Sequence, residues 1–267
     1  MNVAVDKPTP AIIRGVRLTR AAVHLVQGLA TTAFIFPFAK QPSRKRMVQR
    51  WSQRLLRILA VDLEHSGVPA DFNGPVLIVA NHISWLDIFV VNALRPSRFI
   101  AKAELKRWPV VGLLVTSVGT LFLDRTRRRD AARINTQVQE ALAAGDVIAL
   151  FPEGTTTFGR ELLPFHGSLL QPVIEANGQI LPAAISYTHV DGSHSVAAAY
   201  VGDTSFVEAL RQLLRARRTR VRLHLSEPFP THGRHRREVA AEAHRIIRSA
   251  LELAEDEPAA SASRKPS

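Results

Sequence analysis

The chain contains no cysteine among its 267 residues. This absence excludes a disulfide-bonded scaffold, a thiolate nucleophile and any zinc or iron–sulfur site with cysteine ligands. Three nucleotide- or substrate-binding motifs are also missing: G-x-G-x-x-G, G-x-x-x-x-G-K-[ST] and the G-x-S-x-G of hydrolases. The ten histidines show no spacing typical of metal ligands, so we expect no metal site.

Acidic residues are scarce near the N-terminus, where residues 14–57 contain ten Lys and Arg and no Asp or Glu. The whole chain carries a formal net charge of +12 and has a pI near 11.1. This balance predicts an anionic partner, which could be nucleic acid, lipid headgroups or a phosphorylated substrate. A hydrophobic share of 46% with 22% charged residues is typical of a globular protein of one large or two small domains.

The basic N-terminal segment has two features that indicate membrane association. Residues 21–39 are mostly apolar and would form about 28 Å of helix, but polar interruptions and Pro37 favour an interfacial or re-entrant helix over a clean span. Residues 43–61 place apolar side chains at helical spacing around Trp51, opposite an arginine-rich face, as in membrane-surface helices. The alternative is a solvated helix whose apolar stripe packs against the domain.

The rest of the chain alternates between predicted strands and helices. We expect extended segments at 75–80, 98–105, 118–124, 146–151, 179–187, 195–202 and 221–226, and helices at 86–94, 130–144, 205–216 and 236–253. This alternation predicts an α/β fold, with one domain built on a mixed, largely parallel sheet flanked by helices. We expect N-terminal membrane-associated helices over 1–61, this domain over 62–253 and a disordered tail over 254–267.

The segment Asn-His-Ile-Ser-Trp-Leu-Asp (81–87) directly follows the predicted strand 75–80. In one continuous helix His82 and Asp87 would point about 140° apart. If His82 lies in the strand–helix loop and Asp87 in the first helical turn, the carboxylate can fix the imidazole tautomer and leave the other nitrogen to take a proton. The alternative is a helix start at which Ser84 and Asp87 form a capping box.

Two further loops carry groups suited to an anion. In Phe-Pro-Glu-Gly-Thr-Thr-Thr-Phe-Gly (151–159), Gly154 permits close approach to the backbone, and threonine hydroxyls and amides could bind an anion. The alternative is a turn capped by threonine. Arg125 ends the segment 119–125 and leads into arginines at 127–129. A guanidinium fork suits phosphate, although a basic run of this kind is commonly a solvated face.

Together these segments resemble the sequence blocks of the glycerolipid acyltransferase family, the lysophosphatidic acid acyltransferase-like enzymes. NHISWLD resembles the family's N-H-x-x-x-x-D block, GTLFLDR its G-x-x-F-x-x-R block, and FPEGTTT its F-P-E-G-T block. ILPAAI resembles its fourth block, an apolar strand with a central proline, here Pro182. Each block is short, but the ordered set over 81–185 is specific. Many members have Arg after F-P-E-G-T, whereas this chain has Thr156, which removes one phosphate contact.

The resemblance implies a transferase that moves a fatty acyl group from acyl-CoA or acyl-carrier protein, used as co-substrate, to the sn-2 hydroxyl of 1-acyl-sn-glycerol-3-phosphate, forming phosphatidic acid. It implies that His82 is the general base and Asp87 its orienter, with no cofactor and no metal. The matching positions imply acceptor binding by Arg125, Glu153, Gly154, Thr155 and Lys102. The expected location is the cytoplasmic face of the inner membrane, monotopic or single-span, where the lysolipid is drawn from an anionic membrane surface.

Three alternatives are kept. The acceptor could be a lyso-ornithine lipid or another lysolipid without a phosphate, because the segment 201–210 is similar to one in ornithine-lipid acyltransferase relatives as well as in phosphatidic-acid-forming ones. Thr156 favours the ornithine lipid, whereas the basic run 125–129 favours phosphate. Eleven Arg against three acidic residues over 211–248 would suit a nucleic-acid-binding module. That alternative leaves the ordered blocks unexplained and offers no segment interleaved with aromatic residues, so we expect no nucleic acid partner. A membrane-bound, inactive scaffold would not explain why both His82 and Asp87 are present.

Overall fold

The computed structural model describes residues 8–69, 74–107, 112, 115–116, 118–123 and 128–252. The tail predicted over 254–267 and Arg125 lie outside the described residues. The helices that position the site are α1 (Ala11–Ala30), α2 (Gln41–Ile58), α3 (Asp87–Leu94), α5 (Arg128–Ala143), α6 (Gln171–Glu175), α7 (Phe206–Arg215) and α8 (Arg236–Ala250). The strands are β1 (Val61–Gly67), β2 (Val76–Ala80), β3 (Arg98–Lys102), β4 (Leu121–Leu123), β5 (Ile148–Leu150), β6 (Gln179–Thr188), β7 (Thr219–Leu225) and β8 (Phe229–Pro230).

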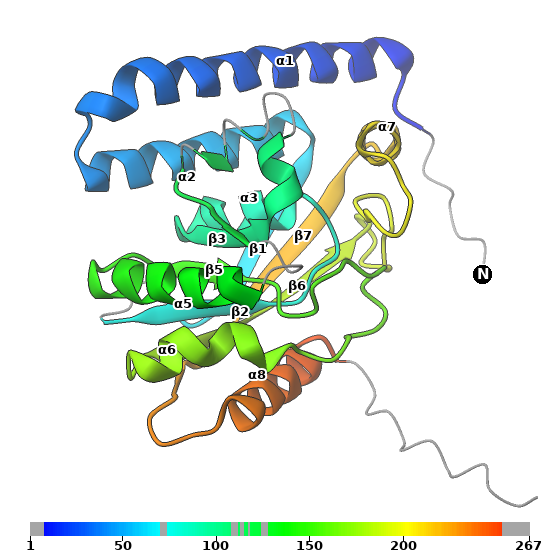
Figure 1. Ribbon diagram of the computed structural model, residues 1–267. Coiled ribbons are helices and arrows are strands. Elements are labelled where there is room, and N and C mark those ends of the chain that lie inside the picture. The colour runs from blue at the N-terminus through cyan, green and yellow to red at the C-terminus, as the bar shows by residue number, and fades with distance from the viewer. Residues whose placement is uncertain are drawn as a thin grey trace, which may run out of the picture.

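The strands form one mixed sheet in the order β1-β7-β6-β2-β5-β3-β4, with β8 paired beside β6. Neighbouring strands are parallel except where β6 meets β7 and β8, which run antiparallel to it. Helices cover both faces, with α1, α2 and α3 on one side and α6 and α8 on the other (Figure 1). The predicted fold class, a mixed and largely parallel sheet flanked by helices, is confirmed.

The two faces of the sheet bury separate apolar clusters because successive strand residues point to opposite sides. On β2, Val76 and Ile78 pack with residues of α2 and α3, whereas Leu77 and Val79 pack with residues of α5 and α8. All five residues of β2 are buried. A strand buried on both faces reads as a continuous apolar run, which explains why the sequence predicted this element well.

The structure differs from the predicted elements at several places. The extended segment predicted over 98–105 ends at Lys102 and is followed by a 3-10 helix, Ala103–Arg107, and the sequence did not predict α6 or β8. Residues 195–202 form turns instead of the predicted strand, and within this part of the chain only an isolated bridge from His194 to Thr188 is made. Its apolar character has another cause, because Ala198 and Ala199 are buried in the core without pairing. The sequence did not predict β1, which pairs in parallel with β7 at the edge of the sheet and is exposed over its last four residues.

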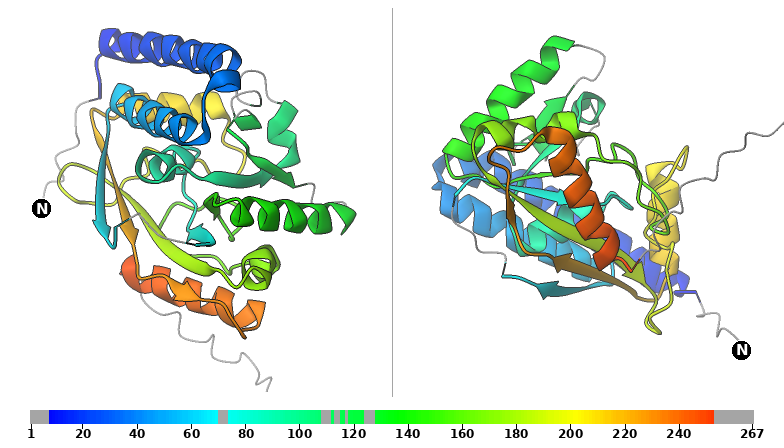
Figure 2. Two further views of the ribbon diagram at one scale, coloured as in Figure 1. Left: turned by 90° about the vertical axis from the view of Figure 1, so that its left-hand side faces the viewer. Right: turned by 90° about the horizontal axis from the view of Figure 1, so that it is seen from below.

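The N-terminal segment forms a helical hairpin stacked above α3 (Figure 2). α1 continues through a π-helical turn, Thr31–Ile35, and a 3-10 turn, Phe36–Phe38, before α2 returns beneath it. The rings of His24 and Trp51 stack at 4.6 Å, His24 Nε2 lies 3.0 Å from the Trp51 carbonyl, and Trp51 Nε1 donates to the His24 carbonyl. A Cβ added at Gly28 would lie 2.7 Å from Trp51 Nε1, so the helices approach closely here because residue 28 has no side chain.

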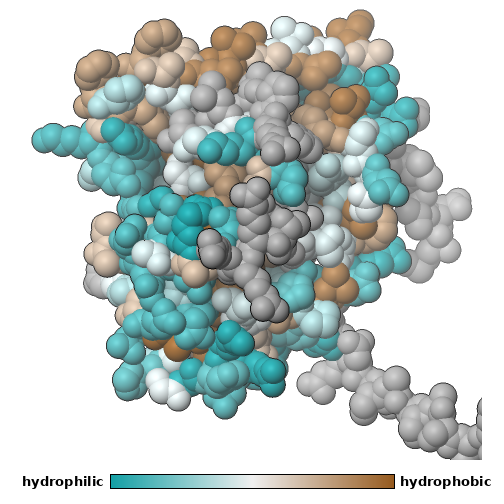
Figure 3. Space-filling view, in the orientation of Figure 1, coloured by the Kyte–Doolittle hydropathy of each residue, from teal (hydrophilic) through white to brown (hydrophobic). Residues whose placement is uncertain are grey.

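The apolar stripe of α2 is buried in the core. Leu55, Leu56 and Ile58 are each no more than 5% exposed, and they join the cluster that covers one face of the sheet. The structure therefore matches the packing alternative for this helix, not the membrane-surface interpretation. The exposed apolar surface belongs to α1 and the turn after it, where Ile12 is 82% exposed, Phe34 75% and Phe38 88%. Figure 3 shows hydrophobic residues gathered along this edge of the molecule.

The segment Ala11–Phe38 is long and apolar enough to cross a membrane by length and composition, and most of it is exposed. One side of α1 packs on α2 through Ala21, His24 and Gly28, and its N-terminal half is tied to the domain. Thr9 Oγ1 donates to the Ala216 carbonyl and Arg17 donates to the carbonyls of residues 216 and 217. The helix thus lies along the domain with one apolar side uncovered.

Candidate active site

The candidate site lies where β2, β5 and β6 present adjacent ends. β2 is parallel to β5 with Val79 opposite Leu150, so the loops that follow these two strands meet at one edge of the sheet. β6 lies on the other side of β2, with Ala80 opposite Ala183. Loops at the carboxyl ends of parallel strands form the binding crevices of α/β proteins. Segments 81–87 and 151–159, far apart in the sequence, come together here.

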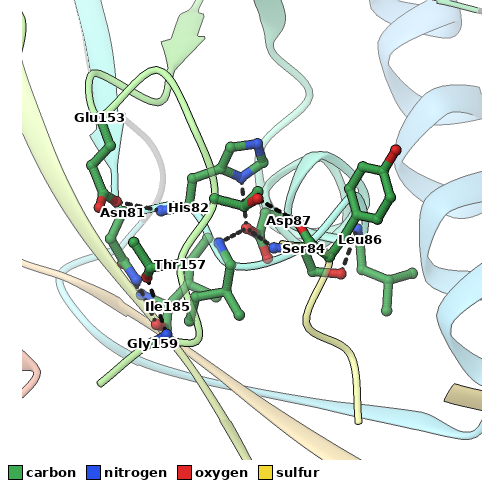
Figure 4. A network of polar contacts seen from close by, with 12 residues as sticks. Asn81, His82, Ser84, Leu86, Asp87, Glu153, Thr157, Gly159 and Ile185 are labelled. Atoms are coloured by element: carbon green, nitrogen blue, oxygen red, sulfur yellow. Dashed lines mark hydrogen bonds and ion pairs between the residues drawn. The ribbon is translucent and has the colours of Figure 1, made fainter. Parts of the chain in front are cut away.

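His82 and Asp87 meet across the β2–α3 connection (Figure 4). His82 lies in the loop, Asp87 is the first residue of α3, and His82 Nδ1 is 2.9 Å from Asp87 Oδ2. The structure thus has the loop arrangement in which the two side chains can meet. A charged acceptor on Nδ1 fixes the imidazole with its proton on that nitrogen, which leaves Nε2 as the basic nitrogen.

The carboxylate of Asp87 is fully buried and held by further donors. Its Oδ2 accepts the backbone N–H groups of Ile83 at 2.7 Å and Ser84 at 2.9 Å. Its Oδ1 accepts the hydroxyl of Tyr187 from β6 at 2.7 Å. Burial, followed by the charge of Asp87, raises the pKa of Tyr187 well above its usual value, so the phenol stays protonated as a donor. The helix-start alternative also forms in part: the Ser84 N–H donates to Asp87 Oδ2, and Ser84 Oγ accepts the N–H of Leu86 at 3.1 Å. Asp87 therefore binds the His82 imidazole and caps the start of α3 at the same time.

The plane of the His82 ring is set by Phe151, the residue after β5. The two rings stack with centroids 4.0 Å apart and planes 5° apart, and Phe99 supports Phe151 from behind at 5.7 Å. The His82 side chain is 20% exposed. Nε2 has no hydrogen-bond partner among the described residues. The imidazole is therefore held by Asp87 at Nδ1 and by Phe151 on one face, and Nε2 is available.

Glu153 lies beside the backbone of His82, and its carboxylate accepts hydrogen bonds from two backbone N–H groups. Its Oε1 accepts the N–H of His82 at 2.8 Å and its Oε2 accepts the N–H of Leu163 at 2.9 Å, while the residue is only 4% exposed. Burial raises the pKa of Glu153 to about 7, against the opposing effect of these two hydrogen bonds. A carboxylate engaged in this way joins the two loops and supports the backbone of His82.

The other sequence-predicted site residues have different surroundings. Gly154 adopts a φ of 73° and its N–H donates to the Phe151 carbonyl, which makes the sharp turn after β5. Thr155 is exposed on this turn. Lys102 is the last residue of β3, whose carboxyl end lies at the same edge of the sheet as those of β2 and β5, and Arg125 falls outside the described residues.

The remaining threonines of the loop serve its own structure. The hydroxyl of Thr156 donates to the Tyr200 carbonyl, and the Thr157 N–H donates to the His82 carbonyl. Thr157 Oγ1 accepts the N–H of Gly159. The position that carries Arg in many family members is thus used here to join the loop to the segment before α7.

Sequence reasoning missed two residues that support the site, Tyr187 and Asn81. Asn81 makes two hydrogen bonds to the backbone of Ile185, at 2.9 and 2.7 Å, which fasten the end of β2 to β6. Tyr187 was hidden within the apolar run of β6. A signal existed, because Tyr187 is two and four residues from Ile185 and Ala183 and so faces the same side of the strand.

Within the described part of the chain, no group of three or more His, Asp or Glu side chains is arranged to hold a metal ion. The chemistry available at the site is that of one imidazole base with a buried carboxylate partner. A base of this type can remove a proton from a hydroxyl positioned at Nε2.

Comparisons with known proteins agree with this arrangement. The acyltransferase family model matches residues 57–186. The chain is 40% identical over 210 residues to the lyso-ornithine lipid O-acyltransferase of Pseudomonas aeruginosa, which covers 79% of this chain and 80% of that protein. It is 40% identical over 158 residues to the 1-acyl-sn-glycerol-3-phosphate acyltransferase of Neisseria meningitidis, covering 59% of this chain and 62% of that protein.

The fold is also similar to a solved structure. The crystal structure of the 1-acyl-sn-glycerophosphate acyltransferase from Thermotoga maritima superposes with a TM-score of 0.68 at 20% sequence identity. The alignment covers 90% of this chain and 94% of that one. At this identity the likeness concerns the fold alone.

Proposed function

The chain belongs to the glycerolipid acyltransferase family, and on that premise we propose that it transfers a fatty acyl group from a thioester to the hydroxyl of a lysolipid with His82 as the general base. The observation that carries this assignment is the 2.9 Å contact between His82 Nδ1 and Asp87 Oδ2, together with the uncommitted Nε2. In the family's reaction, the acceptor hydroxyl and the thioester donor would both lie next to Nε2 of His82.

The reaction needs no covalent enzyme intermediate. Nε2 of His82 takes the proton from the acceptor hydroxyl while its oxygen attacks the thioester carbonyl carbon. The carbon–sulfur bond then breaks, the new ester bond remains, and the imidazolium returns its proton to the departing thiolate. Asp87 stabilises the imidazolium between these two proton transfers. A thioester is already activated, so a correctly held alcohol and one base are sufficient, and we propose no metal or cofactor.

We propose that the uncovered side of α1 rests in the cytoplasmic leaflet of the inner membrane. The exposed apolar residues of α1 and the turns after it include Ile12, Phe34 and Phe38. Arg44 of α2 lies over the ring of Phe36 in the same turn, so basic and apolar groups occur together, as in helices that bind anionic membrane surfaces. The monotopic arrangement is favoured over a single span, because spanning would separate α1 from Trp51 and break the contacts of Arg17 and Thr9.

The first proposed acceptor is 1-acyl-sn-glycerol-3-phosphate, with acyl-CoA or acyl-carrier protein as donor and phosphatidic acid as product. The headgroup would be bound by Arg125 and Lys102 with Gly154 and Thr155 at the loop after β5. Glu153 supports this site from below, since both of its oxygens are engaged with backbone N–H groups.

A second acceptor, lyso-ornithine lipid, is favoured by a specific observation. The relative named for that substrate matches over 80% of its length, whereas the relative named for the phosphate acceptor matches over 62% at the same identity. The engagement of Thr156 with the Tyr200 carbonyl also removes one position at which a phosphate contact would be expected.

The test is release of free thiol from a long-chain acyl-CoA by purified protein in detergent, with each of the two lysolipids in turn. His82→Ala is the control with both. Turnover with one lysolipid that is lost in His82→Ala assigns that acceptor. Equal turnover in His82→Ala would overturn the role of the base. If neither acceptor supports turnover with acyl-CoA or with acyl-carrier protein as donor, the proposed reaction is wrong.

A further inference from the structure

Tyr187 lies against the proposed base pair but is outside the four sequence blocks. It sits on β6, its side chain is completely buried, and its hydroxyl donates to Asp87 Oδ1 at 2.7 Å. Its ring belongs to the same apolar cluster as Ile185 and Val90. A buried phenol in an apolar cluster needs one partner for its hydroxyl, and here that partner is the carboxylate beside the imidazole.

The contact made by Tyr187 differs in kind from the other contacts of Asp87. His82, Ile83 and Ser84 all donate to the same oxygen, Oδ2, and all belong to the loop that leads into α3. Among the described residues, Tyr187 is the one donor to Oδ1 and the one donor from another element. It ties the carboxylate to the sheet, whereas the loop donors would move with the loop.

We propose that Tyr187 is a positioning residue for acyl transfer, which acts through Asp87 to set both the orientation of the His82 imidazole and its affinity for a proton. This inference rests on the proposed role of His82 as the base. Without the phenol, Oδ1 would be a buried, unsatisfied acceptor. Its negative charge would be less dispersed, so the carboxylate would stabilise the imidazolium more strongly and hold the proton on His82 to higher pH.

The titratable groups around the pair come from three elements. Asp87 itself begins α3, Glu153 reaches the His82 backbone from the loop after β5, and Tyr187 faces Asp87 from β6. No other charged side chain contacts the pair within the described part of the chain. Since Glu153 is retained in every variant compared below, its own titration contributes equally to each profile.

The experiment compares Tyr187→Phe with Tyr200→Phe, since these are the two tyrosines of the chain. Tyr200 is matched because its contacts to the site are made by its backbone, which the substitution keeps. The rate constant kcat and KM are measured from pH 5 to 9 with the accepted lysolipid. In Tyr187→Phe we expect kcat to fall about tenfold at neutral pH with KM within about twofold, because the carboxylate loses its tie to β6 and no longer holds the imidazole in one orientation, and this loss outweighs the stronger attraction for the imidazolium. We expect the acidic limb to move up by about half a pH unit or more. Tyr200→Phe should follow the wild type.

A purely structural role gives a different result. If Tyr187→Phe lowers the melting temperature but leaves kcat within twofold and the acidic limb in place, the proposal is wrong. That failure is distinct from failure of the proposed function, in which His82→Ala would keep its activity. Should Tyr187→Phe not fold, 3-fluorotyrosine is incorporated into Tyr200→Phe, where it replaces Tyr187 alone. The more acidic phenol donates more strongly, so the limb should move to lower pH, and an unmoved limb overturns the proposal.

Discussion

Replacement of Asp87 by asparagine removes one charge from the site and keeps the shape of the side chain. In Asp87→Asn the amide oxygen can occupy the place of Oδ2, where it accepts from His82 Nδ1 and the two backbone N–H groups. The amide nitrogen then faces the phenol of Tyr187, whose oxygen can accept from it. The Tyr187 oxygen gains a donor while its hydroxyl proton loses the acceptor at residue 87, and the other buried contacts of this side chain are kept. We therefore expect the variant to fold, with a melting temperature lowered by no more than a few degrees.

The substitution Asp87→Asn removes the charge that stabilises the protonated state of His82. Nδ1 and Oδ2 are 2.9 Å apart, which places the charge centres of imidazolium and carboxylate about 4 Å apart. At an effective dielectric constant of about 20, the attraction between them is about 4 kcal/mol. It exists only after His82 has accepted the proton, so it lowers the energy of the transition state relative to the resting enzyme. Its removal should lower kcat by about 10³-fold.

The assay is steady-state thiol release with saturating lysolipid, and the melting temperature is measured on the same preparation. Asp191→Asn is the matched control: it removes the same charge from an exposed turn and should leave kcat unchanged. A kcat for Asp87→Asn within tenfold of the wild type would refute the idea that carboxylate charge stabilises the imidazolium.

Three further predictions address the membrane face, the buried carboxyl and the hairpin. Phe34→Ser combined with Phe38→Ser should weaken sedimentation with anionic vesicles by about 10²-fold, since each Phe that becomes buried in the membrane contributes about 1.5–3 kcal/mol. The double variant should keep its activity in detergent, and unchanged sedimentation would contradict the assignment of this face. The folded-state pKa of Glu153 is raised from 4.5 to about 7, so its contribution to stability is complete below pH 4.5 and is lost as pH rises through about 7. Relative to Glu153→Gln, the wild type should therefore lose up to about 3 kcal/mol of unfolding free energy between pH 4.5 and about 7, as measured by urea titration. If the difference in unfolding free energy between the two proteins does not change with pH, the raised pKa of Glu153 is wrong. Gly28→Leu should destabilise the protein by about 1–3 kcal/mol through overlap with the tryptophan of α2, as seen by melting temperature, whereas Gly15→Leu, with no atom within 4 Å of its added Cβ, should not; equal effects would exclude this overlap as the cause.

Local patterns predicted those parts of the site that depend on strand ends. β2 and β5 are buried on both faces and appear in the sequence as continuous apolar runs, so the positions of His82 and Glu153 just beyond them could be inferred. The contacts that these two residues make could not be inferred from the sequence. Whether Glu153 faces a ligand or the His82 backbone depends on how the loop after β5 folds over the loop after β2, which no spacing within either loop encodes.

The amphipathic helices illustrate the same limit. Helical periodicity identifies an apolar side but not what covers it. The apolar stripe of α2 is covered by the sheet and α3, whereas α1 and the turn after it, with their more interrupted pattern, keep apolar residues such as Ile12 and Phe34 exposed. The turn segment 195–202 was misjudged for a related reason, because burial of Ala198 and Ala199 produces an apolar run without any strand pairing.

The site is assembled from residues distant in the sequence, and this has a consequence for synthesis. Asp87 and Tyr187 are 100 positions apart, Asn81 and Ile185 104, and His82 and Glu153 71. A ribosome produces the chain from its N-terminus, so the α1–α2 hairpin is complete long before β6 leaves the exit tunnel. A nascent chain therefore contains the apolar helix α1 well before β6 can supply Tyr187 to the His82–Asp87 pair. On this order of events, the apolar face proposed to contact the membrane is made before the proposed base and its supporting residues are assembled.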